Sequence, residues 1–305
     1  MSFVEQARQC HMETLYQKEQ KMIYKGIGVA ICTPFDSKGE FNSKAYKHHI
    51  NFLIENGVKA IISCGTTGEA STMSLDEQLS VVECAVKSAD GRVPIIAGAG
   101  GNNTAACIKS GKEFTNIGAN ALMYVAPYYN KTSQKGLIQH FTHIADNVNL
   151  PIMIYNVPSR TGLNISPNTI AEIAKHERIV AIKEASSDIT QITEVFALSD
   201  IHVYSGNDDH ILPVMALGGL GVVSTIGNIV PKKLVSLINA CISGDYEQAR
   251  LLQFEILPLW RLLFADVNPM PVKAALNILG FDAGACRLPL TDIDDSLKEQ
   301  IKAIL

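Results

Sequence analysis

Lys183 ends an apolar run, Ile179 to Lys183, that is typical of a short buried strand. An ammonium group in that position is drawn out of water, which lowers its pKa and raises the fraction of neutral amine. Because a neutral amine attacks ketones, we interpret Lys183 as a nucleophile that forms a Schiff base. The alternative is that Lys183 only pairs with Glu184, but neighbours on a strand point to opposite faces.

Tyr155 ends the preceding apolar run, Pro151 to Tyr155. If both runs are adjacent strands of one sheet, Tyr155 lies beside Lys183 at the same rim. Imine formation needs protons moved at the carbinolamine, and a phenol near the ketone can donate and accept them. The alternative is a tyrosine that caps the core with its hydroxyl group in solvent.

A hydroxyl-rich turn, Gly65 to Glu69, follows another apolar run. Its glycines let backbone N–H groups converge, and Thr66 and Thr67 add two hydroxyl donors. The turn therefore predicts a site for a small carboxylate. A turn of this composition with no ligand is the alternative.

Two loops carry further candidates. Arg160 lies in the segment that follows Tyr155, where its guanidinium group could bind a second carboxylate in bidentate fashion, unless it is only a surface arginine. Tyr128 and Tyr129 are adjacent, and they could supply hydroxyl groups to the site or form a subunit contact.

Two other patterns are poor candidates for a site. Gly98, Gly100 and Gly101 hint at a dinucleotide turn, but Asn103 replaces the third glycine of that motif. His140 and His143 could together reach a metal ion, yet no carboxylate or third histidine is near them in the sequence. We therefore predict neither a nucleotide cofactor nor a metal site.

The elements that must position these residues alternate regularly. Eight strand-like runs are predicted, each followed by an amphipathic stretch of helical length. The runs are Gly28 to Cys32, Ala60 to Cys64, Pro94 to Ala97, Ala121 to Val125, Pro151 to Tyr155, Ile179 to Lys183, His202 to Ser205 and Gly221 to Ser224. Eight repeats predict an α/β fold, the (β/α)8 TIM barrel, with an open α/β sheet as the alternative.

The helices are predicted at Ser43 to Glu55, Leu75 to Ala89, Thr104 to Asn116, Lys135 to Asn147, Asn168 to Lys175, Asp188 to Leu198, Asp208 to Leu217 and Pro231 to Ile242. Ser74 and Glu77 form a capping box before the second of them. Three further helices, Tyr246 to Phe264, Pro271 to Leu279 and Asp292 to Ile304, follow without strands. We therefore divide the chain into an N-terminal extension (1–21), a barrel (22–244) and a C-terminal helical domain (245–305).

The composition of the chain bears on its partners and on the cellular compartment. The chain has 305 residues, of which 47% are hydrophobic and 18% charged, and a formal net charge of −4, which does not favour nucleic acid as a partner. No apolar stretch reaches the ~18 residues that cross a bilayer, so we expect no membrane association. The seven cysteines form no CxxC pair, which favours a reducing cytoplasm.

Four segments together resemble the dihydrodipicolinate synthase family of pyruvate-dependent class I aldolases. They are Gly65–Glu69 (GTTGE), Pro127–Asn130 (PYYN), Tyr155–Gly162 (YNVPSRTG) and Ile182–Ala185 (IKEA), and SGNDD from Ser205 and NPMPVK from Asn268 extend the likeness. The likeness runs from about Tyr24 to the end of the chain.

The resemblance implies 4-hydroxy-tetrahydrodipicolinate synthase activity, a lyase reaction (EC 4.3.3.7). Such an enzyme condenses pyruvate with L-aspartate-4-semialdehyde in the diaminopimelate route of lysine biosynthesis, without a metal or organic cofactor. The resemblance also implies a homotetramer, a dimer of dimers.

The resemblance further implies a role for each site residue. Lys183 would form the imine, and Tyr155 would relay protons with Thr66 and with Tyr129 of a neighbouring subunit. Thr66 and Thr67 would hold the pyruvate carboxylate. For the semialdehyde, Arg160 would bind its carboxylate, and the main chain of Gly206 and Val223 would line the pocket.

Two alternatives stay open. N-acetylneuraminate lyase-like enzymes and keto-deoxy sugar acid aldolases or dehydratases share the lysine and the tyrosine, but Arg160 and Thr67 match the synthases. A keto-acid sensor would lack Lys183 or Tyr155, and this chain has both.

The resemblance also bears on whether lysine inhibits the enzyme. Many bacterial members of the family bind lysine at a subunit interface through histidine and glutamate side chains and a tyrosine. Tyr128 and Asn102 match that pattern, but Leu75 and Ala106 stand where the histidine and glutamate are expected. We predict weak or absent inhibition by lysine.

Overall fold

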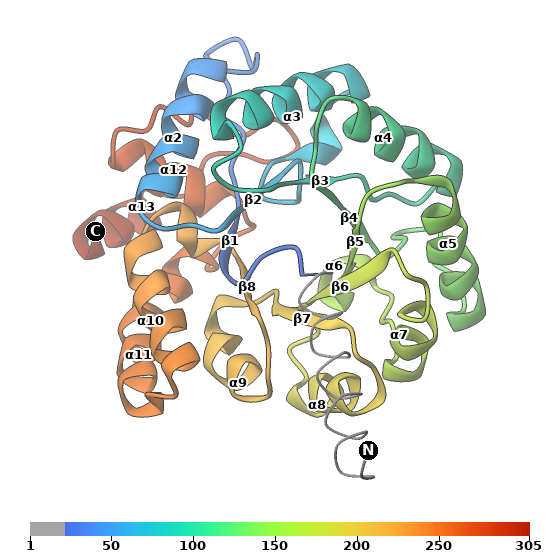
Figure 1. The fold of residues 1–305 in the computed structure, drawn as a ribbon. Helices are drawn as coiled ribbons and strands as arrows, with labels where there is room; N and C mark the ends of the chain where they lie inside the picture. Colours follow the sequence, from blue (N-terminus) through green and yellow to red (C-terminus); the bar gives the residue numbers. More distant parts are fainter. Residues whose placement is uncertain (1–21) are drawn as a thin grey trace.

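Eight parallel strands form a closed barrel in the computed structural model, which describes residues 22–305. Each strand pairs with the next one along the chain, and β8 closes on β1. The strands are β1 (Gly26–Ala30), β2 (Ala60–Ser63), β3 (Ile95–Gly98), β4 (Ala121–Val125), β5 (Ile152–Asn156), β6 (Ile179–Glu184), β7 (His202–Ser205) and β8 (Gly221–Ser224). Figure 1 shows the helices as a ring around them. The predicted (β/α)8 barrel is confirmed, and the open sheet is wrong.

The predicted strand ends are wrong by one or two residues at several strands. β1 begins at Gly26 instead of Gly28, because Gly26 and Ile27 pair with β8, and it ends at Ala30. Cys32 lies beyond the strand, and its backbone N–H donates to the side chain of Asn228. β5 and β6 each continue one residue further than predicted, through Asn156 and Glu184.

Helices cover the outside of the barrel. They are α2 (Ser43–Glu55), α3 (Leu75–Ala89), α4 (Thr104–Asn116), α5 (Gln134–Asn147), α7 (Pro167–Ile173), α8 (Ile189–Leu198), α9 (Ile211–Ala216) and α10 (Pro231–Ser243). The capping box of Ser74 and Glu77 is confirmed, because each side chain accepts from the other residue's backbone N–H.

The predicted helix from Asp208 to Leu217 is wrong at its start. Residues Asp208–His210 form a 3-10 turn, η2, and α9 begins only at Ile211. The carboxylate of Asp208 accepts hydrogen bonds from the side chain of Ser224, the last residue of β8, and from two backbone N–H groups just after it, which fixes this turn against the barrel. Three other short elements were not predicted: η1 (Ala70–Thr72), α6 (Pro158–Thr161) and η3 (Ile226–Asn228).

The apolar core has two layers. A larger cluster fills the space between strands and helices, and a smaller one fills the barrel itself. The inner cluster includes Tyr155 and Ala181, whereas Ile154 and Ile182 belong to the outer one. This alternation places the side chain of Lys183, two residues after Ala181, on the inner face of the barrel.

After Gly244 the chain continues as α11 (Tyr246–Leu263), α12 (Met270–Ile278) and α13 (Asp295–Ile304). Phe281, which follows α12, packs its ring on Phe52 of α2 at a centroid distance of 4.8 Å, so this region folds back onto the first barrel helix (Figure 1). The domain boundaries predicted from the sequence stay a prediction, and the extension (1–21) lies outside the described residues. Within 22–305, no helix is long and apolar enough to cross a membrane.

Candidate active site

Lys183 and Tyr155 lie side by side inside the barrel mouth. They are register partners on β6 and β5, and Nζ of Lys183 lies 4.2 Å from the centroid of the Tyr155 ring. Only 6% of Lys183 is exposed. The predicted neighbourhood of these two residues is therefore confirmed.

Burial lowers the pKa of the Lys183 amine to about 7. Desolvation of the ammonium form is the main cause; the negative charge of Asp208 raises the pKa and the positive charge of Arg160 lowers it further. A substantial fraction of the amine is therefore neutral near pH 7, and the neutral form is the one that attacks a carbonyl.

Glu184 lies on the opposite, outer face of β6 and does not pair with Lys183. Its buried carboxylate accepts from the side chain of Asn156 at 3.0 and 3.2 Å and from the backbone N–H of Ser186 at 2.7 Å. Asn156 also donates to Asn164, which fixes the far end of the loop that carries Arg160. The alternative in which Lys183 only pairs with Glu184 is therefore excluded. Glu184 instead helps to order the loop that carries Arg160.

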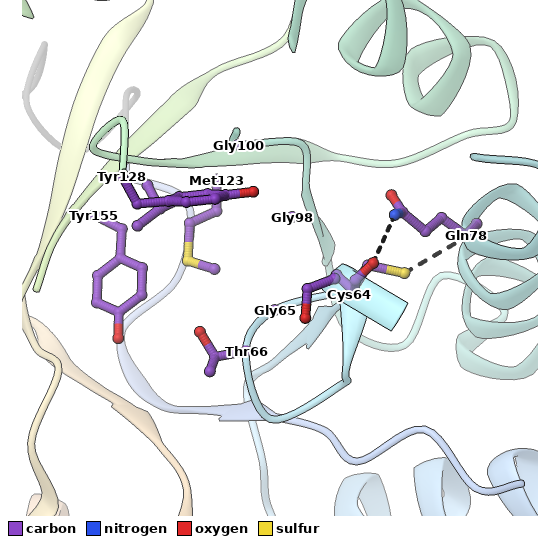
Figure 2. A pocket seen from close by; sticks show the side chains of 12 residues that line it. Cys64, Gly65, Thr66, Gln78, Gly98, Gly100, Met123, Tyr128 and Tyr155 are labelled. Atoms are coloured by element: carbon purple, nitrogen blue, oxygen red, sulfur yellow. Dashed lines mark hydrogen bonds between the residues drawn. The ribbon is translucent and has the colours of Figure 1, made fainter. Parts of the chain in front are cut away.

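Tyr155 faces a cavity of about 210 Å³ at the carboxyl ends of β2 to β5. Its hydroxyl group forms no hydrogen bond to residues 22–305, and in the view of Figure 2 it ends at about the level of the Thr66 side chain. Burial raises the pKa of Tyr155 to about 12, and the charge of Arg160 opposes this rise. The phenol is therefore protonated at neutral pH and free to donate. Lys183 does not line this cavity and lies behind Tyr155.

The Gly65–Glu69 turn closes the other side of the cavity. Within it, Gly68 N–H and Ala70 N–H donate to the Gly65 carbonyl group. The N–H groups of Thr66 and Thr67 have no partner among the residues that the structure describes, and these are the donors that a carboxylate would need. The side chain of Thr66 is exposed toward the cavity (Figure 2), whereas that of Thr67 is buried.

The glycines that resembled a dinucleotide turn have a packing role. A Cβ atom on Gly98 would lie 2.1 Å from the carbonyl oxygen of Cys64, and one on Gly100 would lie 2.4 Å from the backbone nitrogen of Val125. The backbone at Gly98, the end of β3, and at Gly100 just after it therefore passes too close to its neighbours for a side chain at either position. Gly98 and Gly100 line the cavity with bare backbone.

Arg160 and Tyr129 are both exposed. Arg160 lies on α6, and its guanidinium group forms no hydrogen bond or ion pair with residues 22–305. Tyr129 is 91% exposed and does not line the cavity, whereas the adjacent Tyr128 does. Of the two tyrosines, only Tyr128 contributes to the cavity of its own chain.

Gly206 directly follows β7, and Val223 lies in β8. The N–H group of Gly206 donates to the Glu184 carbonyl oxygen at 2.7 Å, so this backbone lies against the end of β6 next to Lys183. Val223 is fully buried in the inner cluster of the barrel. Neither residue lines the cavity that Tyr155 faces.

Two residues near the site were missed as functional candidates. Asp208 is buried, and it accepts from Ser224 Oγ at 2.5 Å and from two backbone N–H groups. Asn268 donates to the hydroxyl group of Thr67 at 2.9 Å. Both belong to quoted motifs, but no spacing rule reveals a contact between residues 201 positions apart.

Within residues 22–305, no group of three histidine, cysteine, aspartate or glutamate side chains is placed to bind a metal ion. The side chain of His140 is buried and contacts Thr104, and burial lowers its pKa to about 4. The six cysteines of this range are all free.

Fold and site together define a (β/α)8 barrel protein that carries a buried lysine of lowered pKa beside a tyrosine at the carboxyl ends of its strands. The chain belongs to the dihydrodipicolinate synthetase family, whose model matches residues 23–305. The family predicted from the four motifs is thereby confirmed.

Named relatives agree with this assignment. A 4-hydroxy-tetrahydrodipicolinate synthase of Thermoanaerobacter sp. (strain X514) is 48% identical over 286 residues, which cover 93% of this chain and 96% of that protein. A crystal structure of dihydrodipicolinate synthase from Thermotoga maritima has a TM-score of 0.91 at 40% identity, covering 93% of this chain and 98% of that one. The enzyme from Acinetobacter baumannii, complexed with pyruvate, has a TM-score of 0.90 at 38% identity, with the same coverage.

Proposed function

We propose that this chain has 4-hydroxy-tetrahydrodipicolinate synthase activity and condenses pyruvate with L-aspartate-4-semialdehyde. The main support for this proposal is the buried amine of Lys183, whose pKa is lowered to about 7 and which lies beside the Tyr155 ring. Family membership and the name of the relatives support the same reaction.

The chemistry follows from the positions of these groups. The neutral amine of Lys183 attacks C2 of pyruvate, and loss of water gives a protonated imine. Tyr155 donates and accepts the protons of the carbinolamine step. The imine withdraws electrons from the pyruvate methyl group, which loses a proton to give an enamine. The enamine carbon bonds to the aldehyde carbon, and attack of the semialdehyde's amine on the imine carbon releases Lys183.

The two carboxylates of the substrates have separate partners. The pyruvate carboxylate binds to the backbone N–H groups of Thr66 and Thr67, which have no partner in 22–305, and to the hydroxyl groups of the same two residues. The free guanidinium group of Arg160 binds the semialdehyde carboxylate in bidentate fashion. The backbone at Gly206 and Val223 lines the pocket on the Lys183 side.

The assembly we propose is a homotetramer built from two dimers. Its support is Tyr129, which is almost fully exposed and does not line the cavity of its own chain. A neighbouring subunit would receive this hydroxyl group beside Thr66 and Tyr155. A cytoplasmic location fits the free cysteines.

A coupled assay tests the activity. The purified chain should consume pyruvate only when aspartate semialdehyde is present, and the product should form a dihydrodipicolinate chromophore. N-acetylneuraminate and keto-deoxy sugar acids serve as competing substrates. Cleavage of a sugar acid without turnover of the semialdehyde would overturn the proposal in favour of a sugar-acid aldolase.

A further inference from the structure

The Gly65–Glu69 turn is held by residues from the far end of the chain. Glu69, its last residue, has a left-handed backbone (φ 54°, ψ 35°), which is uncommon for a side chain other than asparagine or aspartate. Its carboxylate forms an ion pair with Lys273 of α12 at 2.6 Å, and its other oxygen accepts from the backbone N–H of Arg287 at 2.9 Å.

The Glu69–Lys273 ion pair lies in the interior, with side-chain exposures of 0% and 2%. Nζ of Lys273 also donates to the carbonyl oxygen of Ala285 and lies 4.3 Å from the centroid of the Phe35 ring. Removing one partner of such a pair leaves an uncompensated buried charge, so the pair fixes the position of α12 relative to the turn.

Asn268, just before α12, contacts the turn at Thr67, whose side chain is buried next to the cavity-facing Thr66. Its amide donates to Oγ1 of Thr67 at 2.9 Å, while its own Oδ1 is buried without a partner among residues 22–305. Because Oγ1 of Thr67 accepts this bond, the hydroxyl hydrogen of Thr67 remains available to donate. An aliphatic residue at position 268 would leave that hydrogen without a fixed direction.

We propose that Asn268, anchored by the Glu69–Lys273 ion pair, is a positioning residue that makes the Thr67 hydroxyl group a hydrogen-bond donor to the carboxylate of the keto acid. The C-terminal region then takes part in substrate binding through the turn. This inference rests on the proposed function, in which Thr67 binds the pyruvate carboxylate.

The test measures pyruvate binding in Asn268→Ala. Its KM for pyruvate should rise about 10-fold or more, the scale of a hydrogen bond to a charged group, while kcat and the KM for the semialdehyde change less than 3-fold. The pyruvate concentration that gives half-maximal borohydride trapping on Lys183 should rise by the same factor. Asn277→Ala is the matched control, because its amide bonds only to Gly284 within the C-terminal region.

A merely structural role predicts a different result. In that case Asn268→Ala, like Asn277→Ala, lowers the melting temperature and leaves the KM for pyruvate unchanged, and the inference is wrong. A double-mutant cycle gives a second reading: in a Thr67→Val background, Asn268→Ala should add less than 2-fold to the KM for pyruvate. If the two substitutions instead raise the KM for pyruvate independently, so that their fold-changes multiply, the inference is also wrong.

Asn268→Asp carries the test if the alanine variant does not fold. Aspartate keeps the size of the side chain and can pair with Thr67 only by accepting its hydroxyl hydrogen. The KM for pyruvate should then rise about 10-fold or more above that of the unaltered chain, and an unchanged KM contradicts the inference. If the unaltered chain gives no pyruvate adduct at all, the proposed function has failed, which is distinct from a failure of the role of Asn268.

Discussion

The strand ends and the loops of this site differ in how firmly they hold their candidate residues. Lys183 and Tyr155 lie on paired strands, are buried, and contact each other. Arg160, on the short helix α6 after β5, and Tyr129, on the loop after β4, are exposed and form no side-chain bond with residues 22–305. The groups for imine chemistry are therefore fixed before substrate arrives, whereas the groups proposed for the second substrate and the subunit contact are held by no side-chain partner of their own chain.

The turn of Thr66 and Thr67 lies between these extremes. It is a loop, yet Asn268, Lys273 and Arg287 hold it from the other end of the chain. Loops at a barrel mouth can therefore be as firmly placed as strands when another region anchors them.

The largest effect should come from Lys183→Met. We expect kcat to fall by at least about 10⁴-fold, the scale on which loss of a nucleophile acts. Steady-state assays with both substrates measure this change. Lys175→Met is the control, because Lys175 is an exposed lysine paired with Glu172, and it should retain full activity. Substantial turnover by Lys183→Met would break the contrast between strand and loop residues.

Tyr155→Phe should lower kcat by about 10²- to 10³-fold, because a general acid-base group is lost. The melting temperature should stay the same, since this hydroxyl group has no hydrogen-bond partner in 22–305. Tyr46→Phe is the control: that buried hydroxyl group bonds to Ser63, outside the site, so its loss should lower stability and spare kcat. The reverse pattern would show that Tyr155 is only a packing residue.

Arg160→Ala should raise the KM for aspartate semialdehyde about 10- to 100-fold through loss of a charge-assisted bond. The KM for pyruvate and the melting temperature should change little, because the side chain is exposed and unpaired. Arg250→Ala, on an exposed face of α11, is the control. An equal rise in both KM values would mean that Arg160 does not separate the two substrates.

The pH dependence should follow the lowered pKa of Lys183, about 7 against an ordinary value of 10.5. Below pH 7 the amine is protonated, so kcat/KM for pyruvate should fall about 10-fold per pH unit. The folded state disfavours the ammonium form, so the burial of Lys183 lowers stability fully below pH 7, and this penalty fades as the pH rises toward 10.5. Lys183→Met should therefore melt above the unaltered chain at pH 6, with a smaller difference at pH 9. A pH-independent difference would contradict the shift.

Lysine should have the smallest effect. Tyr128 lines the cavity, but Leu75 packs against the core and Ala106 is exposed on α4, so neither offers a polar group to a bound amino acid. We expect activity to change less than 2-fold in 1 mM lysine, measured with both substrates at their KM values. Halving of activity by sub-millimolar lysine would contradict this prediction.

The strand-borne part of the site could be predicted from the sequence because alternation along a strand is a local rule. Two apolar runs placed Lys183 and Tyr155 together, and strand geometry separated Lys183 from Glu184. The ends of β1 and the start of α9 could not be predicted, since Gly26 pairs with β8 and Asp208 is held by the loop after β8. Those contacts join distant segments, and no local pattern encodes them.

The bond from Asn268 to Thr67 was missed for the same reason. Its two residues are 201 positions apart, and the motif that holds Asn268 gives no sign of its partner. The role of Tyr129 was likewise beyond a local rule, because its side chain is 91% exposed and does not line the cavity of its own chain. The tetramer stays a proposal, supported by this exposure and by what the resemblance to the family implies.

Borohydride reduction in the presence of pyruvate tests the central claim most directly. A single stable adduct should form on the peptide that contains Lys183, without aspartate semialdehyde, and it should be absent from Lys183→Met. An adduct on another lysine, or none on a chain that turns over both substrates, would contradict it.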